Sequence, residues 1–231
     1  MYNSSFENLL REQASEFLRC KFFIVNGVKI YPKEIEVYYY EQGIFEDYTV
    51  HRNRLQENNK NRFYVHRRGR EASSPIIENN RGGCDFVISE KDGIFHSYLI
   101  RSIVIDDELI VGPCKSLKSI LRKVGLSYKE FEETEVSIMS SATNNDVFMT
   151  SRIGLGDSEK ADSKLYKDAK LRFILCDEYF KQRDKSNVGY PNRTEAIDDF
   201  LRNKIIAGSM TKEQAADYSK KWYGAVSKEF K

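Results

Sequence analysis

Glu34-Ile35-Glu36-Val37-Tyr38 alternates polar and apolar side chains, and this stretch decides how the fold is interpreted. Successive side chains of a β-strand point to opposite faces, so Glu34, Glu36 and Tyr38 share one face while Ile35 and Val37 take the other. The pattern predicts a strand with one apolar face in the core. A carboxylate beside an aromatic ring can activate water, and the ring can cover a flat substrate. The alternative is an edge strand whose polar face only meets solvent.

Short runs of β-branched and aromatic residues recur on both sides of this strand, separated by Gly, Asn and Asp. They predict strands at residues 21–26, 29–40, 62–67, 85–89, 95–105 and 170–175. Helical spacing of apolar residues predicts an amphipathic helix over residues 4–20, with Ser5 as its N-cap, and a second helix over residues 115–123. Several strands with few helices between them favour an α+β fold. We expect a single domain over residues 1–180, with one curved, mainly antiparallel sheet and helices packed against it.

The last part of the chain changes character. Residues 182–193 are mostly polar and are typical of a linker. Beyond them, apolar residues at helical spacing run to Gly208, and Thr211 with Gln214 forms a capping pattern for a second helix. The sequence therefore predicts a helical hairpin over residues 192–231 that packs on the main body or on a partner.

The composition fits a globular protein, since 40% of the 231 residues are hydrophobic and the formal net charge is only +2. No apolar run is long enough to span a membrane, and no secretory leader is recognisable, so we expect a cytoplasmic protein that does not bind membranes. No C-x-x-C pair is present, which favours reduced thiols. The cysteines are Cys20, Cys84, Cys114 and Cys176.

A local basic segment covers residues 51–70 (HRNRLQENNKNRFYVHRRGR), in which Glu57 is the only acid. Phe63 and Tyr64 lie inside it, and this mixture suits phosphate contact combined with base stacking. The alternative is an ordinary solvated basic loop. If the segment binds DNA, the expected phosphate contacts are Arg62, Arg67, Arg68 and Arg70.

Several motifs together resemble the methylpurine (3-methyladenine, alkyladenine) DNA glycosylases, and this chain looks like a divergent branch of that family. Residues 14–38 are similar to the family's opening helix and strand pair, which ends in an E-x-E-x-Y motif. Further motifs follow in the family's order: His51 after Glu46-Asp47, Phe63-Tyr64-Val65-His66, Leu99-Ile100-Arg101, Gly112-Pro113-x-Lys115-x-Leu117, Arg152-Ile153-Gly154-Leu155 and Leu171-Arg172-Phe173.

The resemblance implies monofunctional hydrolysis of the N-glycosidic bond of alkylated or otherwise modified purines, after the base has been flipped out of the DNA helix. Glu36 matches the general base that activates water for attack at C1′. Tyr38 matches the aromatic residue that stacks on the flipped base, and His66 the second stacking aromatic. No lysine suggests itself as a Schiff-base nucleophile, so strand cleavage is not implied.

Three further positions complete the implied pocket. His51 matches an imidazole on the opposite wall, and Arg101 matches an arginine near the binding surface. Asp85 stands where the family has a pocket asparagine. The chain also departs from the family after His66, because a polar loop replaces the tyrosine that normally wedges into the DNA stack.

Other interpretations of the same residues remain open at this point. The chain could be a nucleic-acid or nucleotide-binding module that kept the fold and lost the chemistry, or a hydrolase of a small nucleoside-like ligand. Glu36, His51, His66 and Asp85 could also converge on a divalent metal, although none of their spacings is a metal signature. The favoured interpretation needs DNA as partner and neither a cofactor nor a metal.

Overall fold

The computed structural model describes residues 2–57, 59–79, 82–141, 143–155, 163–179, 193–223 and 227–230. The helices are α1 (Ser4–Cys20), η1 (Arg54–Gln56), α2 (Pro113–Val124), α3 (Tyr128–Glu133), α4 (Ser163–Asp168), α6 (Arg193–Ile206), α7 (Lys212–Tyr223) and η3 (Lys228–Phe230). The strands are β1 (Lys21–Val25), β2 (Val28–Glu41), β3 (Phe45–Glu46), β4 (Phe63–Val65), β5 (Cys84–Val87), β6 (Phe95–Ile105), β7 (Glu108–Val111), β8 (Ser137–Ser140), β9 (Asp146–Thr150) and β10 (Arg172–Cys176).

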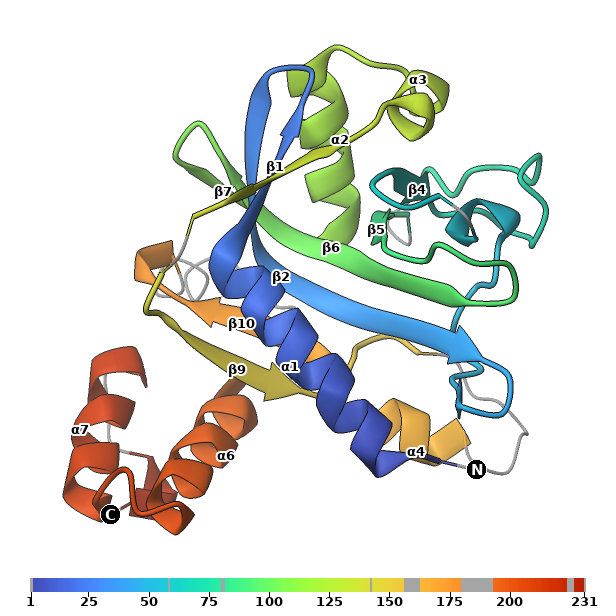
Figure 1. The fold of residues 1–231 in the computed structure, drawn as a ribbon. Helices are drawn as coiled ribbons and strands as arrows, with labels where there is room; N and C mark the ends of the chain where they lie inside the picture. The colour runs from blue at the N-terminus through green and yellow to red at the C-terminus, as the bar shows by residue number, and fades with distance from the viewer. Residues whose placement is uncertain are drawn as a thin grey trace.

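The long strand β2 organises the sheet (Figure 1). One of its edges pairs with β6, whose outer edge pairs with β5 and β7, and β4 follows β5. The other edge pairs in succession with β1, β10 and β3. Because β8 lies beyond β1 and β9 lies beyond β10, the sheet divides into two wings at β2. All of these pairings are antiparallel, so a curved antiparallel α+β architecture is confirmed.

The point of division coincides with an irregularity in β2. Its register with β6 shifts between Pro32 and Glu34 and again between Glu34 and Ile35. Such bulges bend a strand and increase its twist. Regular alternation resumes at Ile35, since Ile35 and Val37 are fully buried in the core, and the predicted assignment of these two side chains to the core is confirmed.

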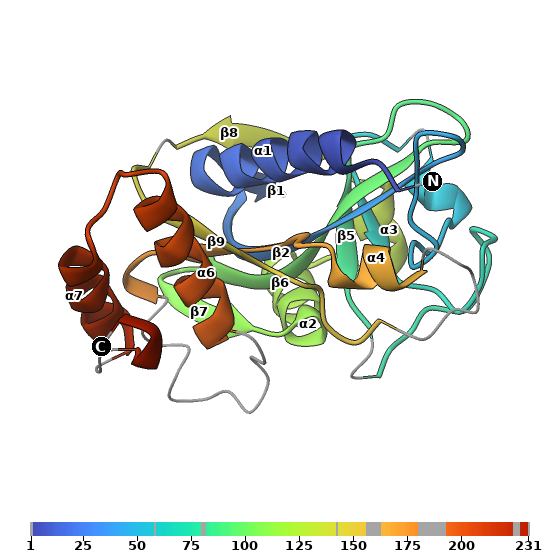
Figure 2. The same ribbon diagram turned by 90° about the horizontal axis from the view of Figure 1, so that it is seen from below.

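Helix α1 covers the core face of the sheet, and α2 lies on the other side (Figure 2). Leu10, Ala14 and Leu18 recur at helical spacing on α1 and are at most 2% exposed. They join the large apolar cluster that includes Ile35 and Val37. The predicted bounds of this helix agree with the structure, but Ser5 is not its N-cap. The side chain of Asn3 accepts the hydrogen bond from Phe6 N instead.

The C-terminal helices α6 and α7 pack on the β9–β10 wing. Phe148 and Ile174 on these strands form a second apolar cluster with Ile197 and Leu201 of α6 and Ala215 of α7. The predicted hairpin therefore exists and packs on the main body. Residues 182–192 of the predicted linker lie outside the described residues, as do the boundaries predicted at 180, 192 and 231. Among the residues that the structure describes, no helix is both long and apolar enough to cross a bilayer.

Candidate functional site

Three neighbouring strands bring the predicted site residues into one row. Glu36 on β2 pairs with Leu99 on β6, and Leu99 pairs with Asp85 on β5. Directly paired residues of antiparallel strands point to the same face, which here is the face opposite Ile35 and Val37. Neighbouring strands are about 4.8 Å apart, so the backbones at Glu36 and Asp85 are separated by roughly 10 Å.

Glu36 is fully buried and held by donors from three parts of the chain. Its Oε1 lies 3.1 Å from the backbone nitrogen of Ile153 and 3.0 Å from Nη1 of Arg101. Its Oε2 accepts a hydrogen bond of 3.0 Å from the hydroxyl of Tyr38. These donors fix the orientation of the carboxylate, and the charge-assisted contact with Arg101 is the strongest of them. The role of the Ile153 backbone could not be seen in the sequence, although Ile153 lies in the Arg-Ile-Gly-Leu motif.

Arg101 also connects Glu36 to a second buried acid. Its Nε lies 3.1 Å from Oε1 of Glu34, and Nε of Arg172 lies 2.6 Å from the same oxygen. We call Glu34, Glu36, Arg101 and Arg172 the acid–arginine cluster. Its two acids and two bases balance in charge, which is the condition under which ionised groups are tolerated in a protein interior.

Arg152 lies against the ring of Tyr38 and supports it. It is buried against Asp47, with 2.5 Å between Nη1 and Oδ2, and its guanidinium lies 4.8 Å from the centre of the Tyr38 ring. Arg152 also donates to the carbonyls of Val37 and Tyr166. Burial disfavours the charged guanidinium, but the charge and hydrogen bond of Asp47 together with Tyr38 and Glu36 outweigh it, so the pKa of Arg152 is raised. Sequence reasoning placed Arg152 in a motif and missed this role.

A second polar group, which we call the histidine–aspartate cluster, comprises His66, Asp85, Gln56 and Ser97. His66 Nε2 lies 2.6 Å from Oδ1 of Asp85, while the Gln56 amide and the Ser97 hydroxyl both donate to Oδ2 at 2.9 Å. The Gln56 amide is fixed in turn, because its oxygen accepts from Asn53 N. Burial of Asp85 opposes ionisation, but the charge and hydrogen bond of His66 prevail and lower its pKa.

His51 lies at the solvent-exposed rim of this cluster. Its ring centre is 4.8 Å from that of His66, and its Nδ1 is 3.4 Å from the hydroxyl of Tyr64. Partial loss of hydration and then the nearby His66 lower the pKa of His51, with Asp85 acting in the opposite direction. The two histidines are therefore brought together, as the family resemblance implies.

Tyr38 lies between the two clusters. Burial of its hydroxyl raises its pKa well above the ordinary value, and the negative charge of Glu36 adds to this shift. Arg152 opposes it, and Asp85 contributes in the same direction as Glu36. The phenol is thus a neutral hydrogen-bond donor to the Glu36 carboxylate. The Tyr38 side chain is half-buried, so part of its surface meets solvent.

We expect Asp85→Asn to lower the free energy of unfolding at pH 7 by about 1–3 kcal/mol, because the amide cannot accept all the hydrogen bonds that the carboxylate accepts. Since the pKa of Asp85 is lowered on folding, its contribution is present above the ordinary aspartate value of about 3.9 and disappears as the pH falls through the folded-state pKa. Urea unfolding at pH 7, 5 and 3.5 should therefore show a difference between parent and variant that narrows on acidification. Exposed Asp217→Asn is the control, and a pH-independent difference would contradict the assignment.

The arginines of the basic segment differ in their contacts and in their exposure. Arg67 forms a two-pronged ion pair with Glu132, with both N–O distances 2.6 Å, and donates to the carbonyls of Val65 and Ala72. Its guanidinium therefore serves the fold.

Arg68 and Arg70 are exposed on the loop after β4, and Arg62 is half-buried before β4. Of the four arginines expected to contact phosphate, Arg68 and Arg70 are the most accessible.

The four residues considered as metal ligands do not form one group. Glu36 is committed to Arg101, and none of its hydrogen bonds goes to His51 or His66. Within the described residues, no group of three His, Cys, Asp or Glu side chains has the arrangement needed to hold a metal ion. The metal alternative has no support from the geometry.

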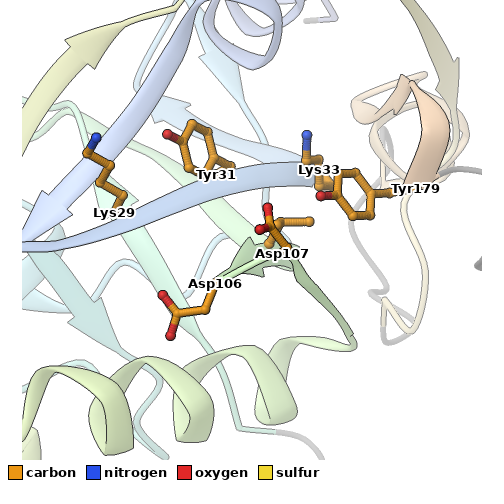
Figure 3. Close-up of a pocket in the computed structure, with 7 residues that line it drawn as sticks. Lys29, Tyr31, Lys33, Asp106, Asp107 and Tyr179 are labelled. Carbon is orange, nitrogen blue, oxygen red and sulfur yellow. The ribbon is translucent and has the colours of Figure 1, made fainter.

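A cavity of about 350 Å³ is lined by no member of either cluster (Figure 3). Its charged groups are largely paired: Lys33 lies 2.6 Å from Asp177, and Asp106 lies 2.6 Å from Lys123. The residues labelled around it are Lys29, Tyr31, Lys33, Asp106, Asp107 and Tyr179.

Neither a scan against protein-family models nor a search of curated proteins finds a match to this chain. The likeness to the methylpurine DNA glycosylases therefore rests on the ordered motifs. Of the motif residues, Glu36, Arg101 and Arg172 lie in the acid–arginine cluster, and His66 lies in the histidine–aspartate cluster.

Proposed function

We propose that the chain is a monofunctional DNA glycosylase that hydrolyses the N-glycosidic bond of a modified purine, with Glu36 as general base. The observation that carries the proposal is the orientation of the Glu36 carboxylate, which is held by Arg101 and Ile153 N at one oxygen and capped by Tyr38 at the other. A carboxylate accepts up to about four hydrogen bonds, so this set leaves capacity for one water.

The reaction needs a water aligned with C1′ while the bond to the base breaks. Glu36 accepts the proton of that water, and fixed donors keep the carboxylate aimed without reorganisation during the reaction. Because Tyr38 caps Glu36 in this structure, the Tyr38 hydroxyl must yield its place when water and substrate enter. Its ring then becomes the surface on which the flipped base stacks.

The imidazoles of His51 and His66 lie against each other and form the opposite wall of the proposed pocket, with His51 on the solvent side. Exposed arginines next to this wall supply the charge that holds a phosphate backbone. These surroundings support a nucleic-acid substrate over a free nucleoside.

Neutralising Arg68 and Arg70 together, as Arg68→Gln/Arg70→Gln, should weaken oligonucleotide binding. The slope of log K against log salt concentration should fall by about one for each phosphate that the variant no longer neutralises. Fluorescence anisotropy over a salt series measures both. Arg19→Gln/Lys220→Gln removes the same charge from exposed positions on α1 and α7 and should leave the slope unchanged. Binding without salt dependence would favour the small-ligand hydrolase instead.

One observation favours a second candidate, a nucleic-acid-binding module without catalysis. Glu36 has no exposed surface in this structure, so water reaches it only when the cap moves. The deciding experiment is release of free base, with formation of an abasic site, from oligonucleotides that each carry one modified purine. Release supports the glycosylase. Salt-dependent binding without release across the panel would leave the binding module.

A further inference from the structure

We infer that the cavity of about 350 Å³ beside β2 is a binding site for a guanine nucleotide. Such a ligand combines a flat ring system, two parallel N–H donors and a phosphate group. Cavities of this size are at the lower end of the range that small-ligand sites occupy. Because no residue of the acid–arginine cluster or of the histidine–aspartate cluster lines the cavity, the inference does not depend on the proposed function.

The register of the sheet places an aromatic ring at the centre of this cavity. Lys29, Tyr31 and Lys33 are two residues apart along β2 and share one face of the strand. On one side, Tyr31 pairs with Val104 of β6, which is buried and lines the cavity. On the other side, the Tyr31 ring stacks on Phe22 of β1, with ring centres 4.8 Å apart and 22° between their planes. The orientation of the Tyr31 ring is therefore fixed.

A second tyrosine, Tyr179, lines the same cavity and is fixed by three contacts. Its backbone nitrogen donates to Asp177 at 3.0 Å, and its hydroxyl donates to Asp107. Its ring centre lies 5.0 Å from Nζ of Lys33. Two oriented aromatic rings in one cavity suit a flat ligand, since any base can stack on such a surface.

The charges around the cavity indicate which groups the flat ligand carries. Lys33 and Asp106 are neutralised by the ion pairs described above. Lys29 has no ion-pair partner among the residues that the structure describes, and the only printed contact of Asp107 there is the neutral hydroxyl of Tyr179. Lys29 and Asp107 are therefore the two charges left for a ligand.

These two charges lie on either side of Tyr31 in Figure 3. The ligand thus needs an anionic group at one end and hydrogen-bond donors at the other, with a ring between them. A free α-amino acid does not fit, because both of its charges are attached to one carbon. A carboxylate with two acceptor oxygens matches the N1–H and the amino group of guanine, and a lysine binds phosphate as a point charge.

The backbone at Asp107 gives an independent argument. Asp106 and Asp107 form the two-residue turn between β6 and β7, with φ values of 49° and 60°. Turns of this kind favour Asn-Gly, and the β1–β2 hairpin has Asn26-Gly27 at the corresponding positions. A carboxylate in place of the glycine strains the backbone, and residues strained in this way cluster at functional sites. The side chain of Asp107 therefore has a role beyond the turn.

The test is calorimetric titration of the full chain with guanosine 5′-monophosphate. Inosine 5′-monophosphate lacks the amino group that we assign to Asp107, and guanosine lacks the phosphate that we assign to Lys29. Each should bind about ten- to a hundredfold more weakly, the usual effect of losing a hydrogen bond to a charged group. Inorganic phosphate alone should bind more weakly than any of the three.

Three variants locate the ligand. Lys29→Gln should weaken binding of guanosine 5′-monophosphate by about tenfold or more but leave guanosine unaffected, and Lys212→Gln, an exposed lysine on α7, is the matched control. Asp107→Asn should remove the preference for guanosine over inosine 5′-monophosphate. Asp107→Gly should do the same, and glycine adopts this backbone conformation without strain, so an unchanged Tm separates loss of binding from loss of the turn.

Absence of binding to the parent would overturn the inference, as would equal affinity for guanosine 5′-monophosphate, inosine 5′-monophosphate and phosphate. Unchanged affinity in both Lys29→Gln and Asp107→Gly would place the nucleotide elsewhere and overturn it too. Base release by Lys29→Gln should equal that of the parent, so each of these failures is distinguishable from failure of the proposed function.

Discussion

Replacing Glu36 by glutamine is expected to reduce base release by about 10²–10⁴-fold, the largest effect on activity that we predict. The amide keeps the shape of the side chain, and its oxygen can still accept from Arg101 and Ile153 N. Its NH₂ group can face the hydroxyl of Tyr38, which can accept as well as donate. The variant should therefore fold and bind DNA, but it cannot take a proton from water at neutral pH.

The measurement is single-turnover release of free base, with oligonucleotide affinity determined in parallel. Exposed Glu108→Gln, which makes the same chemical change on β7, should behave as the parent. Unchanged release by Glu36→Gln would remove this residue from the mechanism. Loss of affinity together with loss of release would instead indicate that Glu36 shapes the pocket.

The largest effect on stability is expected for Arg152→Met. Removing one partner of a buried ion pair leaves the other charge uncompensated, at a cost of about 3–5 kcal/mol in the free energy of unfolding. Asp47 would be that charge, since it is fully buried with Arg152 at 2.5 Å. For a chain of this size such a destabilisation lowers Tm by about 6–20 °C.

Arg202→Met is the matched control, because Arg202 pairs with Glu229 at 2.6 Å on the surface, where its side chain is 48% exposed. Exposed pairs of this kind contribute at most about 1 kcal/mol. The double variant Asp47→Leu/Arg152→Met should regain part of the stability that Arg152→Met alone removes, as a double-mutant cycle would reveal. Similar Tm values for Arg152→Met and Arg202→Met would refute the structural role of the buried pair.

Local patterns predicted the elements well where one face of an element is apolar. Alternation at Ile35 and Val37 predicted β2, and helical spacing of Phe6, Leu9, Leu10, Phe17 and Leu18 predicted α1. Strands β3, β7, β8 and β9 escaped prediction. Residues 137–140 of β8 are exposed or only half-buried, so no apolar alternation marks them.

The sequence predicted candidate site residues but neither the contacts that hold them nor all of the side chains that join them. Arg172 in the apolar run of residues 171–176 indicates that a charged group needs a buried partner. Its partner Glu34 lies 138 positions away, and no local pattern gives that distance. Alternation did place Glu34 and Glu36 on one face, and both carboxylates contact Arg101 there.

Gln56 shows the same limit. It lies in a polar stretch with no functional signal, yet it fixes Asp85 through an amide that η1 orients. Only the three-dimensional pairing of the segment before β4 with β5 reveals this contact.

The packing of α6 and α7 on β9 and β10 bears on how this gene can change over time. Arg172 and Ile174 lie two residues apart on β10 and therefore share a face. Arg172 joins the acid–arginine cluster, and Ile174 joins the apolar cluster shared with the C-terminal helices. A frameshift or early stop codon after residue 179 would spare every member of the candidate site. It would nevertheless strip the cover from Phe148 and Ile174 on the strands beside Glu36. The strands that carry the candidate site therefore depend for their cover on a pair of helices that contributes no residue to either cluster.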